Sequence, residues 1–184
     1  MNVRLIAGKY GGRMLATPKN NRTHPMSERI RGSLFNILGE AVQGAVVLDA
    51  FAGSGSLGLE ALSRGALRVV FTEKDRVAAR VIEENAHALR IDDKKYDVIK
   101  TTLNNWLSSS TSQEFDLIFC DPPYHDLQFS TISKLFAYLK PNGLMVLSHS
   151  GRSEIPTETG VVVVDNRSYG NAVLTFYRKE VSGS

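Results

Sequence analysis

The sequence predicts an α/β protein built around a doubly wound, mostly parallel sheet of seven strands. From residue 45 onward, short apolar runs alternate with segments of helical periodicity, as in a parallel sheet whose helices connect its strands. The last two apolar runs have no helix between them, which indicates a closing antiparallel hairpin. A basic segment precedes this pattern. We therefore expect a short N-terminal extension over residues 1–40, folded as a hairpin and a helix and packed on a domain over residues 41–184.

Each strand is predicted from a short apolar run that is bounded by turn-forming or polar residues. The five runs predicted to be parallel lie at residues 45–48, 68–71, 97–99, 115–120 and 144–147. The two runs of the final hairpin lie at residues 161–164 and 172–177, on either side of a turn-like segment at 166–170.

Helical patterns occupy the connections between these strands. Residues 57–64 form the first, which Gly65 ends. The second follows the second strand and places four apolar residues on one face: Val77, Val81, Ile82 and Leu89. The third precedes the fifth strand, ends before a turn at residues 141–143, and has its apolar residues at helical spacing: Ile132, Leu135, Phe136 and Leu139.

Composition excludes several classes of protein. A hydrophobic fraction of 42% in 184 residues, with mixed charges, excludes a disordered or fibrous chain and suits one domain with one core. A single cysteine excludes an internal disulfide, and the four histidines are scattered, so no metal site is expected. Residues 1–9 lack the apolar core of a signal peptide, and no run approaches a membrane span. We expect a cytoplasmic monomer that engages no membrane.

The positive charge is concentrated at the N-terminal end. Residues 1–40 carry seven Lys and Arg against two Glu, a net charge of +5, whereas the rest of the chain has a net charge of −2. Such an asymmetry indicates contact with a polyanion, although a solvated basic arm without a partner has the same composition.

The first strand leads into a glycine-rich loop. Gly53, Gly55 and Gly58 satisfy the pattern G-x-G-x-x-G, and Glu73 follows Gly53 by 20 residues at the end of the second strand. An acid at that position accepts hydrogen bonds from ribose hydroxyls, so a nicotinamide dinucleotide is one candidate ligand. Asp49 favours another, because a carboxylate facing the glycine turn repels a pyrophosphate and attracts an ammonium and a sulfonium. S-adenosylmethionine carries both cations.

A second loop follows the fourth strand at the same edge of the predicted sheet, and it reads Asp121-Pro122-Pro123-Tyr124. The prolines remove backbone donors, which leaves the Asp121 carboxylate and the Pro122 carbonyl as two acceptors. Two acceptors suit an amino group with two N–H bonds, and Tyr124 can stack on the ring that bears it. Holding both hydrogens aims the nitrogen lone pair at a methyl carbon. The loop therefore predicts transfer of a methyl group to an aryl amine, with Asp121 or water removing the proton.

Residues 49–66, 73–75, Asn85 and 121–124 resemble the bacterial small-subunit ribosomal RNA guanine-N2 methyltransferases. The resemblance extends to residues 6–13 and 27–38, and to Tyr169, Gly170 and the last strand, so it covers nearly the whole chain. It implies S-adenosylmethionine-dependent methylation of a guanine N2 amine in 16S ribosomal RNA, within the small subunit or an assembly intermediate.

The resemblance also implies roles for individual residues. The catalytic residues would be Asp121, Pro122 and Tyr124. The cofactor-binding residues would be Asp49, Phe51, Gly53, Ser54, Gly55, Glu73, Lys74, Thr102, Leu103 and Asp121. The residues on RNA phosphates would be Lys9, Arg13, Arg22, His24, Arg29 and Arg31, with Lys19 as a further candidate. This sequence departs from the family pattern at His24, Met26, Gly32 and Thr102.

Three other functions remain open from the sequence. A DNA adenine-N6 methyltransferase has a similar loop to residues 121–124, but such enzymes usually carry a separate recognition domain. A ribosome-assembly or RNA-binding factor without catalysis would tolerate changes in the Gly53 loop or at Asp121, and both are intact. A dinucleotide oxidoreductase would share only the glycine pattern. Arg29 and Arg31 have an alternative interpretation as the solvated face of a helix whose Leu34 packs inward.

Overall fold

The computed structural model describes residues 2–19, 25–109 and 112–183. A two-stranded hairpin near the N-terminus pairs β1 (Val3–Arg4) with β2 (Met14–Leu15). The other strands are β3 (Val46–Asp49), β4 (Arg68–Thr72), β5 (Tyr96–Ile99), β6 (Phe115–Cys120), β7 (Leu139–His149), β8 (Val161–Tyr169) and β9 (Ala172–Lys179). The helices are α1 (Glu28–Leu38), α2 (Ser56–Ser63), α3 (Arg76–Ala88), α4 (Leu103–Ser109) and α5 (Phe129–Leu135). Three single-turn 3₁₀ helices are η1 (Gly39–Val42), η2 (Asp93–Lys95) and η3 (Phe136–Tyr138).

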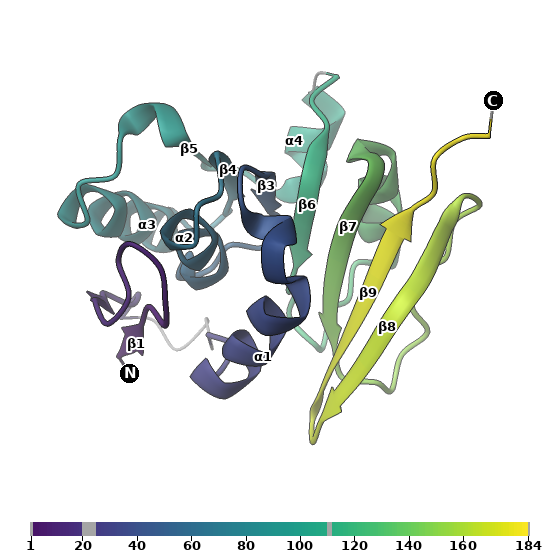
Figure 1. Cartoon of the computed structure of the whole chain (residues 1–184), viewed down its shortest axis with the longest axis horizontal. Helices are drawn as coiled ribbons and strands as arrows, with labels where there is room; N and C mark the ends of the chain where they lie inside the picture. The colour runs from purple at the N-terminus through teal and green to yellow at the C-terminus, as the bar shows by residue number, and fades with distance from the viewer. Residues whose placement is uncertain (1, 20–24, 110–111, 184) are drawn as a thin grey trace.

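Strands β3 to β9 form one sheet of seven in the order β5-β4-β3-β6-β7-β9-β8 (Figure 1). The first five strands in this order are parallel, and β9 runs antiparallel to both β7 and β8. The prediction of a doubly wound sheet with a closing hairpin is confirmed. The strand order reverses between β3 and β6, so a crevice is expected outside their carboxyl ends.

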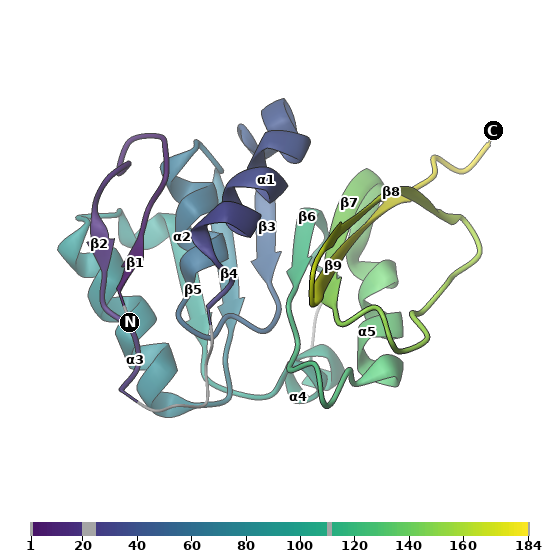
Figure 2. The ribbon, with the colours of Figure 1, turned by 90° about the horizontal axis from the view of Figure 1, so that it is seen from below.

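The helices cover both faces of the sheet, and alternate residues of each strand point to opposite faces. In β3, Val47 belongs to a core cluster shared with α1, α2 and α3, whereas Leu48 belongs to a second cluster shared with α4 and α5. Figure 2 shows α1, α2 and the N-terminal hairpin together over one side of the sheet. Each helix is therefore held by burial of apolar side chains against the strands.

The N-terminal hairpin is fastened to α2 and α3 by buried polar side chains. The Glu60 carboxylate accepts the Ile6 N–H with both oxygens, at 3.1 and 3.0 Å. The Asn85 side chain accepts the Ala16 N–H and donates to the Ala16 carbonyl, each at 2.9 Å. These tertiary hydrogen bonds hold the N-terminal hairpin against the helices of the sheet domain, so the described basic residues of the hairpin are not on a free arm. The role of Asn85 in this structure is to bind the hairpin backbone.

Some element boundaries differ from those predicted from the sequence. Strand β7 begins at Leu139, five residues early, because the predicted turn at 141–143 is an irregularity within the strand, with Asn142 at a φ of 64°. Strand β8 continues to Tyr169 through the segment predicted to be a turn. Val77, assigned to the apolar face of α3, is 55% exposed, and Ala78 and Ala79 lie against the core in its place.

Within the described residues, no helix combines the length and the apolar character that a membrane crossing requires.

Candidate active site

A cavity of about 950 Å³ opens at the carboxyl ends of the central strands, where the strand order reverses. Its walls come from the loop after β3, the end of β4, the start of α4, the loop after β6 and the segment before α1. The volume is in the upper part of the range typical of ligand pockets, so it can hold more than one small group.

The glycine loop after β3 is held by Asp49 and by close packing on α3 and β4. The Asp49 carboxylate accepts the Gly58 N–H at 2.9 Å, near the N-terminus of α2. Gly55 has a φ of 78°, and a Cβ there would lie 2.9 Å from Ile82. A Cβ at Gly58 would lie 2.2 Å from the ring of Phe71. The glycines therefore allow a left-handed turn and a close approach of α2 to the sheet.

Asp49 is 1% exposed, and it is not among the residues that line the cavity. We expected its carboxylate to face a bound cation directly. In the structure the carboxylate instead accepts the Gly58 N–H beneath the cavity. Burial raises the pKa of Asp49 to about 8, the Gly58 N–H opposes this rise, and the charges of Asp121 and Glu73 add to it. Gly55 likewise shapes the loop without lining the cavity.

Glu73, directly after β4, connects the end of that strand to the loop after β3. Its carboxylate accepts the Gly53 N–H at 2.7 Å and the Asp75 N–H at 2.8 Å, so both oxygens support the loops. Each carboxylate oxygen has a second lone pair, and Glu73 lines the cavity, so it can still accept a hydrogen bond from a ligand.

The other predicted cofactor residues come together around the same cavity. Thr102 precedes α4 and its hydroxyl accepts the Asn105 N–H at 3.1 Å, which leaves the hydroxyl proton free to be donated. The predicted residues that line the cavity are Phe51, Gly53, Ser54, Glu73, Lys74, Thr102, Leu103 and Asp121.

The loop after β6 forms the wall on the other side of the reversal point. Asp121, Pro122 and Tyr124 all line the cavity. The Tyr124 hydroxyl lies 2.7 Å from the Ser148 hydroxyl, and its side chain is 39% exposed at the mouth. Burial raises the pKa of Asp121 to about 6, and a hydrogen bond with Ser148 opposes the rise. A carboxyl with this pKa is mainly ionised at neutral pH and can accept protons near pH 6.

Several cavity residues were not predicted from the sequence. Ser148, at the end of β7, is 2% exposed and contacts the predicted catalytic loop. A polar residue directly after the fifth apolar run is the signal that could have identified it, because that strand end lies beside β6. The remaining unpredicted lining residues that belong to α1 or its approach are Pro25, Met26, Ser27 and Ile30.

The described basic residues are not all close to the cavity. Arg29, in the first turn of α1, is exposed and adjoins the lining residue Ile30. The Lys9 N–H donates to the Ser63 carbonyl at the C-terminal end of α2, and Arg13 reaches the Ala88 carbonyl at the end of α3. Both helices start at the carboxyl edge of the sheet and end at the opposite edge (Figure 2). Because Lys9 and Arg13 contact the C-terminal ends of these helices, they lie on the far side from the cavity. Arg22 and His24 lie outside the described residues.

Arg31 does not fit the expected contact with RNA phosphates. Its side chain is 1% exposed, and it donates hydrogen bonds to the backbone carbonyls of Arg4 and Met26. The guanidinium ties the N-terminal hairpin to the segment that lines the cavity, and burial lowers its pKa while Glu60 and Glu28 raise it. The alternative interpretation of Arg31 as part of a solvated helix face is also contradicted, because the residue is interior.

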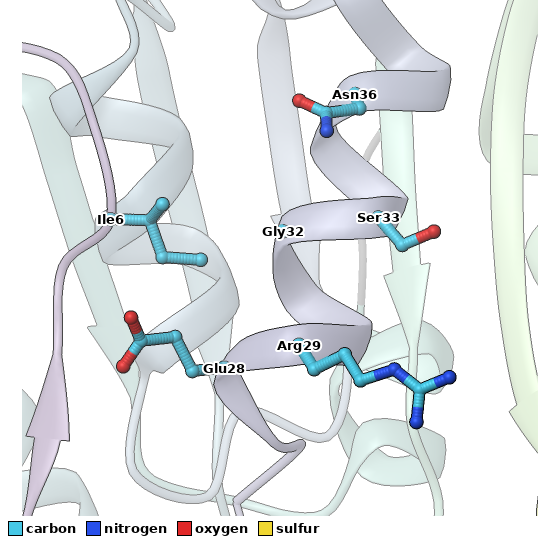
Figure 3. A pocket seen from close by; sticks show the side chains of 6 residues that line it. All are labelled: Ile6, Glu28, Arg29, Gly32, Ser33 and Asn36. Atoms are coloured by element: carbon cyan, nitrogen blue, oxygen red, sulfur yellow. The ribbon is translucent and has the colours of Figure 1, made fainter.

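A second, shallower hollow of about 550 Å³ lies on the outer side of α1 (Figure 3). Figure 3 shows the Arg29 side chain pointing away from Glu28, with Ser33 and Asn36 on the following turns of the helix. Glu28 is paired with Arg4 at 2.7 Å, and Ser33 is hydrogen bonded to Tyr169 from the β8–β9 hairpin. Among the residues that the structure describes, none forms a salt bridge with Arg29, so its charge is available at this surface.

Comparisons with known proteins agree with this architecture. The family described as conserved hypothetical protein 95 matches residues 3–178. The protein named Ribosomal RNA small subunit methyltransferase D from Haemophilus influenzae is 33% identical over 180 residues, which cover 96% of this chain and 93% of that protein. The Escherichia coli protein of the same name is 28% identical, with 98% of this chain and 92% of that protein covered.

Among solved structures, the Escherichia coli protein yhhF has a TM-score of 0.88 and 29% identity, covering 98% of this chain and 99% of its own. These matches confirm the resemblance that the glycine loop and residues 121–124 indicate. They extend over the N-terminal hairpin as well as the sheet, so the whole described fold is shared. The chain therefore belongs to the conserved hypothetical protein 95 family and has the Rossmann-like methyltransferase fold.

Proposed function

We propose that this protein transfers a methyl group from S-adenosylmethionine to the exocyclic N2 amine of a guanine in 16S ribosomal RNA. The observation that carries the proposal is the meeting of Glu73, the Gly53 loop and the Asp121-Pro122 acceptors around one cavity. The names of the relatives from Haemophilus influenzae and Escherichia coli, which are small-subunit ribosomal RNA methyltransferases, support ribosomal RNA as the substrate.

The residues present fit S-adenosylmethionine. The cavity carries the carboxylates of Glu73 and Asp121, which complement a ligand with an ammonium and a sulfonium. Glu73 would accept hydrogen bonds from the ribose hydroxyls, and Thr102 and Leu103 would contact the adenine. When bound, the cofactor supplies an electrophilic methyl group. A cavity of about 950 Å³ leaves room for a target base beside it.

The residues of this chain would supply position and hydrogen-bond acceptors. The Asp121 carboxylate and the Pro122 carbonyl would each accept one hydrogen of the target amine, and Tyr124 would stack on the base. The amine lone pair forms the N–C bond as the C–S bond breaks, and the proton left on nitrogen passes to Asp121 or water. Orientation contributes most of the acceleration, because the lone pair of an aryl amine is delocalised into the ring.

The guanine N2 amine suits these acceptors because it carries two N–H bonds, and the neighbouring N1–H can donate to the second oxygen of an ionised carboxylate. The adenine amine also carries two N–H bonds, so the identity of the product decides between the two bases. The base must leave its stack to enter the cavity, which costs a few kcal/mol and favours an unpaired nucleotide.

The experiment that tests this function supplies labelled S-adenosylmethionine to unmodified 30S subunits, naked 16S RNA and duplex DNA in parallel. Nucleoside mass spectrometry identifies the product. We expect N2-methylguanosine in an RNA sample, and the preferred sample identifies free RNA or the assembled particle as the substrate. N6-methyladenine in the DNA would establish the alternative enzyme. Tight cofactor binding without transfer to any sample would instead support an RNA-binding factor without catalysis.

A further inference from the structure

Two strand ends place Ser148 beside the predicted catalytic carboxylate. Strands β6 and β7 are parallel, and their last paired positions are Cys120 and Leu147. The residues that follow, Asp121 and Ser148, are therefore neighbours at the carboxyl edge of the sheet. Side chains alternate along a strand, so both lie on the face covered by α1 and α2. Ser148 is 2% exposed but still lines the cavity, where its hydroxyl can reach only a few partners.

The Ser148 hydroxyl connects two functional side chains. Its oxygen lies 2.7 Å from the Tyr124 hydroxyl, and a hydrogen bond from the same hydroxyl to the neighbouring Asp121 carboxylate lowers the pKa of that carboxyl. Serine has one proton to donate, and an ionised carboxylate can only accept. With Asp121 ionised, the Ser148 hydroxyl therefore donates its hydrogen bond to Asp121 and accepts the hydrogen bond that the Tyr124 hydroxyl donates. The direction of both hydrogen bonds is fixed for as long as Asp121 is ionised.

We propose that Ser148 is a positioning residue that holds Asp121 and Tyr124 as one hydrogen-bonded unit against the target amine. This inference rests on the proposed function, because it assigns Asp121 and Tyr124 to the amine and its base. The buried Ser148 hydroxyl holds one oxygen of the Asp121 carboxylate. The other oxygen then remains directed to the target amine. It also anchors the half-exposed Tyr124 ring at the mouth, where the base would stack.

The charge state of Asp121 depends on the same contact. The groups that interact with its carboxyl are Asp49 from β3, the Cys120 thiol from β6, and the Tyr124 and Ser148 hydroxyls. Burial favours the neutral carboxylic acid, and the Ser148 hydrogen bond favours the carboxylate that accepts the amine. Loss of the hydroxyl therefore weakens orientation and raises the pKa of Asp121 at the same time.

The test compares the wild-type protein with Ser148→Ala. A matched control is Thr175→Val, which removes another buried hydroxyl of the same sheet, bonded to His149 and Asn166 and not to the Asp121 set. The first readout is a ¹³C NMR titration of the Asp121 carboxyl, which needs no activity. The second is the pH dependence of methyl transfer to 30S subunits, with kcat and KM for RNA measured separately.

We expect the Asp121 titration and the acidic limb of the rate profile to move to higher pH in Ser148→Ala. At pH 7 we expect kcat to fall about tenfold or more, the effect of losing a hydrogen bond to a charged group, with KM for RNA nearly unchanged. Thr175→Val should change neither profile. An unchanged Asp121 titration in a folded Ser148→Ala protein overturns the inference. If the wild-type protein transfers no methyl group, the proposed function fails, while the NMR titration still decides the role of Ser148.

Discussion

At the scale of single residues, the gathering of three carboxyl groups explains how the site can attract a cation. Asp49, Glu73 and Asp121 follow or end three adjacent parallel strands, so the topology places them at one edge of the sheet. Glu73 and Asp121 line the cavity, whereas Asp49 lies beneath it. Burial, with the charges of Asp121 and Glu73, raises the pKa of Asp49 to about 8, so a cationic ligand nearby would favour its ionised form and lower that pKa.

Asp121 can be tested separately from cofactor binding. Asp121→Asn keeps the shape of the side chain but replaces one acceptor oxygen with an amide donor, which opposes an amine hydrogen. We expect methyl transfer to fall by at least about a hundredfold because orientation and charge stabilisation are both lost. The dissociation constant of S-adenosylhomocysteine, measured by calorimetry, should change little, because this product lacks the sulfonium charge that the Asp121 carboxylate would complement. Transfer at the wild-type rate would contradict the proposed role of Asp121 and of the loop around it.

Asp49 should make the free protein less stable as the pH rises. Its pKa is about 8 in the folded protein and has an ordinary value of 3.8, so between these pH values the folded state retains a proton that the unfolded chain has released. The free energy of unfolding therefore decreases from about pH 4 to pH 8, and Asp121, with a pKa of about 6, adds to the decrease up to that pH.

Urea denaturation at pH 5 and pH 8 measures this dependence. Asp49→Asn should flatten it, because an amide does not titrate, while Glu114→Gln, at an exposed position, serves as the matched control. An equally steep decrease in Asp49→Asn would show that the pH dependence arises at other groups.

At the scale of helices and strands, the periodicity of apolar residues was sufficient to predict the sheet and its closing hairpin. Strand β6 has the predicted bounds because its apolar run is continuous and the prolines after Asp121 end it. Strand β7 was predicted too short, because hydrogen bonding to its neighbours accommodates Pro141 and Asn142 within a bulge. The local sequence does not show which neighbouring strand will pair with β7 across such a bulge, so its first residues could not be predicted.

The residues of the candidate site that belong to a local sequence motif could be predicted. The residues whose place depends on tertiary contacts could not. The Gly53 loop, Glu73 and Asp121 each follow a strand at a recognisable spacing. Ser148 is a single serine whose meaning depends on the register between β6 and β7. The burial of Arg31 is also tertiary, since the carbonyl of Arg4 that it contacts is 27 residues away.

Two helical glycines should respond in opposite ways to substitution by alanine. A Cβ at Gly58 in α2 would lie 2.2 Å from Phe71, so Gly58→Ala forces α2 away from β4 and should destabilise the protein by about 1–3 kcal/mol. A Cβ at Gly32 in α1 would lie 3.6 Å from Ile6, an ordinary contact, so Gly32→Ala should stabilise it by about 0.5–1 kcal/mol. Urea denaturation gives both values, and equal effects of the two variants would contradict the packing argument.

At the scale of the whole molecule, the basic residues are divided between two ends of the sheet domain. Arg29 lines the hollow on α1 and directly precedes Ile30, which lines the cavity, whereas Lys9 and Arg13 lie where α2 and α3 end. Helix α3 has 13 residues, so this separation is about 20 Å along its axis. An RNA that delivers a base to the cavity therefore reaches Lys9 and Arg13 only if it extends along the whole flank of the protein.

The length of the RNA should accordingly decide which cations contribute to its affinity. Arg29→Ala should weaken binding to a short RNA loop and to 16S RNA alike, whereas the double variant Lys9→Ala, Arg13→Ala should weaken only the longer RNA. Each lost phosphate contact should lower the slope of log affinity against log salt by about 0.7–0.9. The double variant Lys94→Ala, Lys95→Ala removes the same charge from exposed positions before β5 and is the matched control.

Fluorescence anisotropy at several salt concentrations measures these slopes for both RNA lengths. A length-independent effect of the Lys9 and Arg13 changes would mean that general positive charge attracts the RNA, and the control variant would then have the same effect. A length-dependent effect with an inert control requires a defined path for the RNA from the cavity along α3 to the hairpin. In that case the hydrogen bonds of Asn85 and Glu60 to the hairpin backbone also contribute to recognition, because they fix where Lys9 and Arg13 meet the RNA.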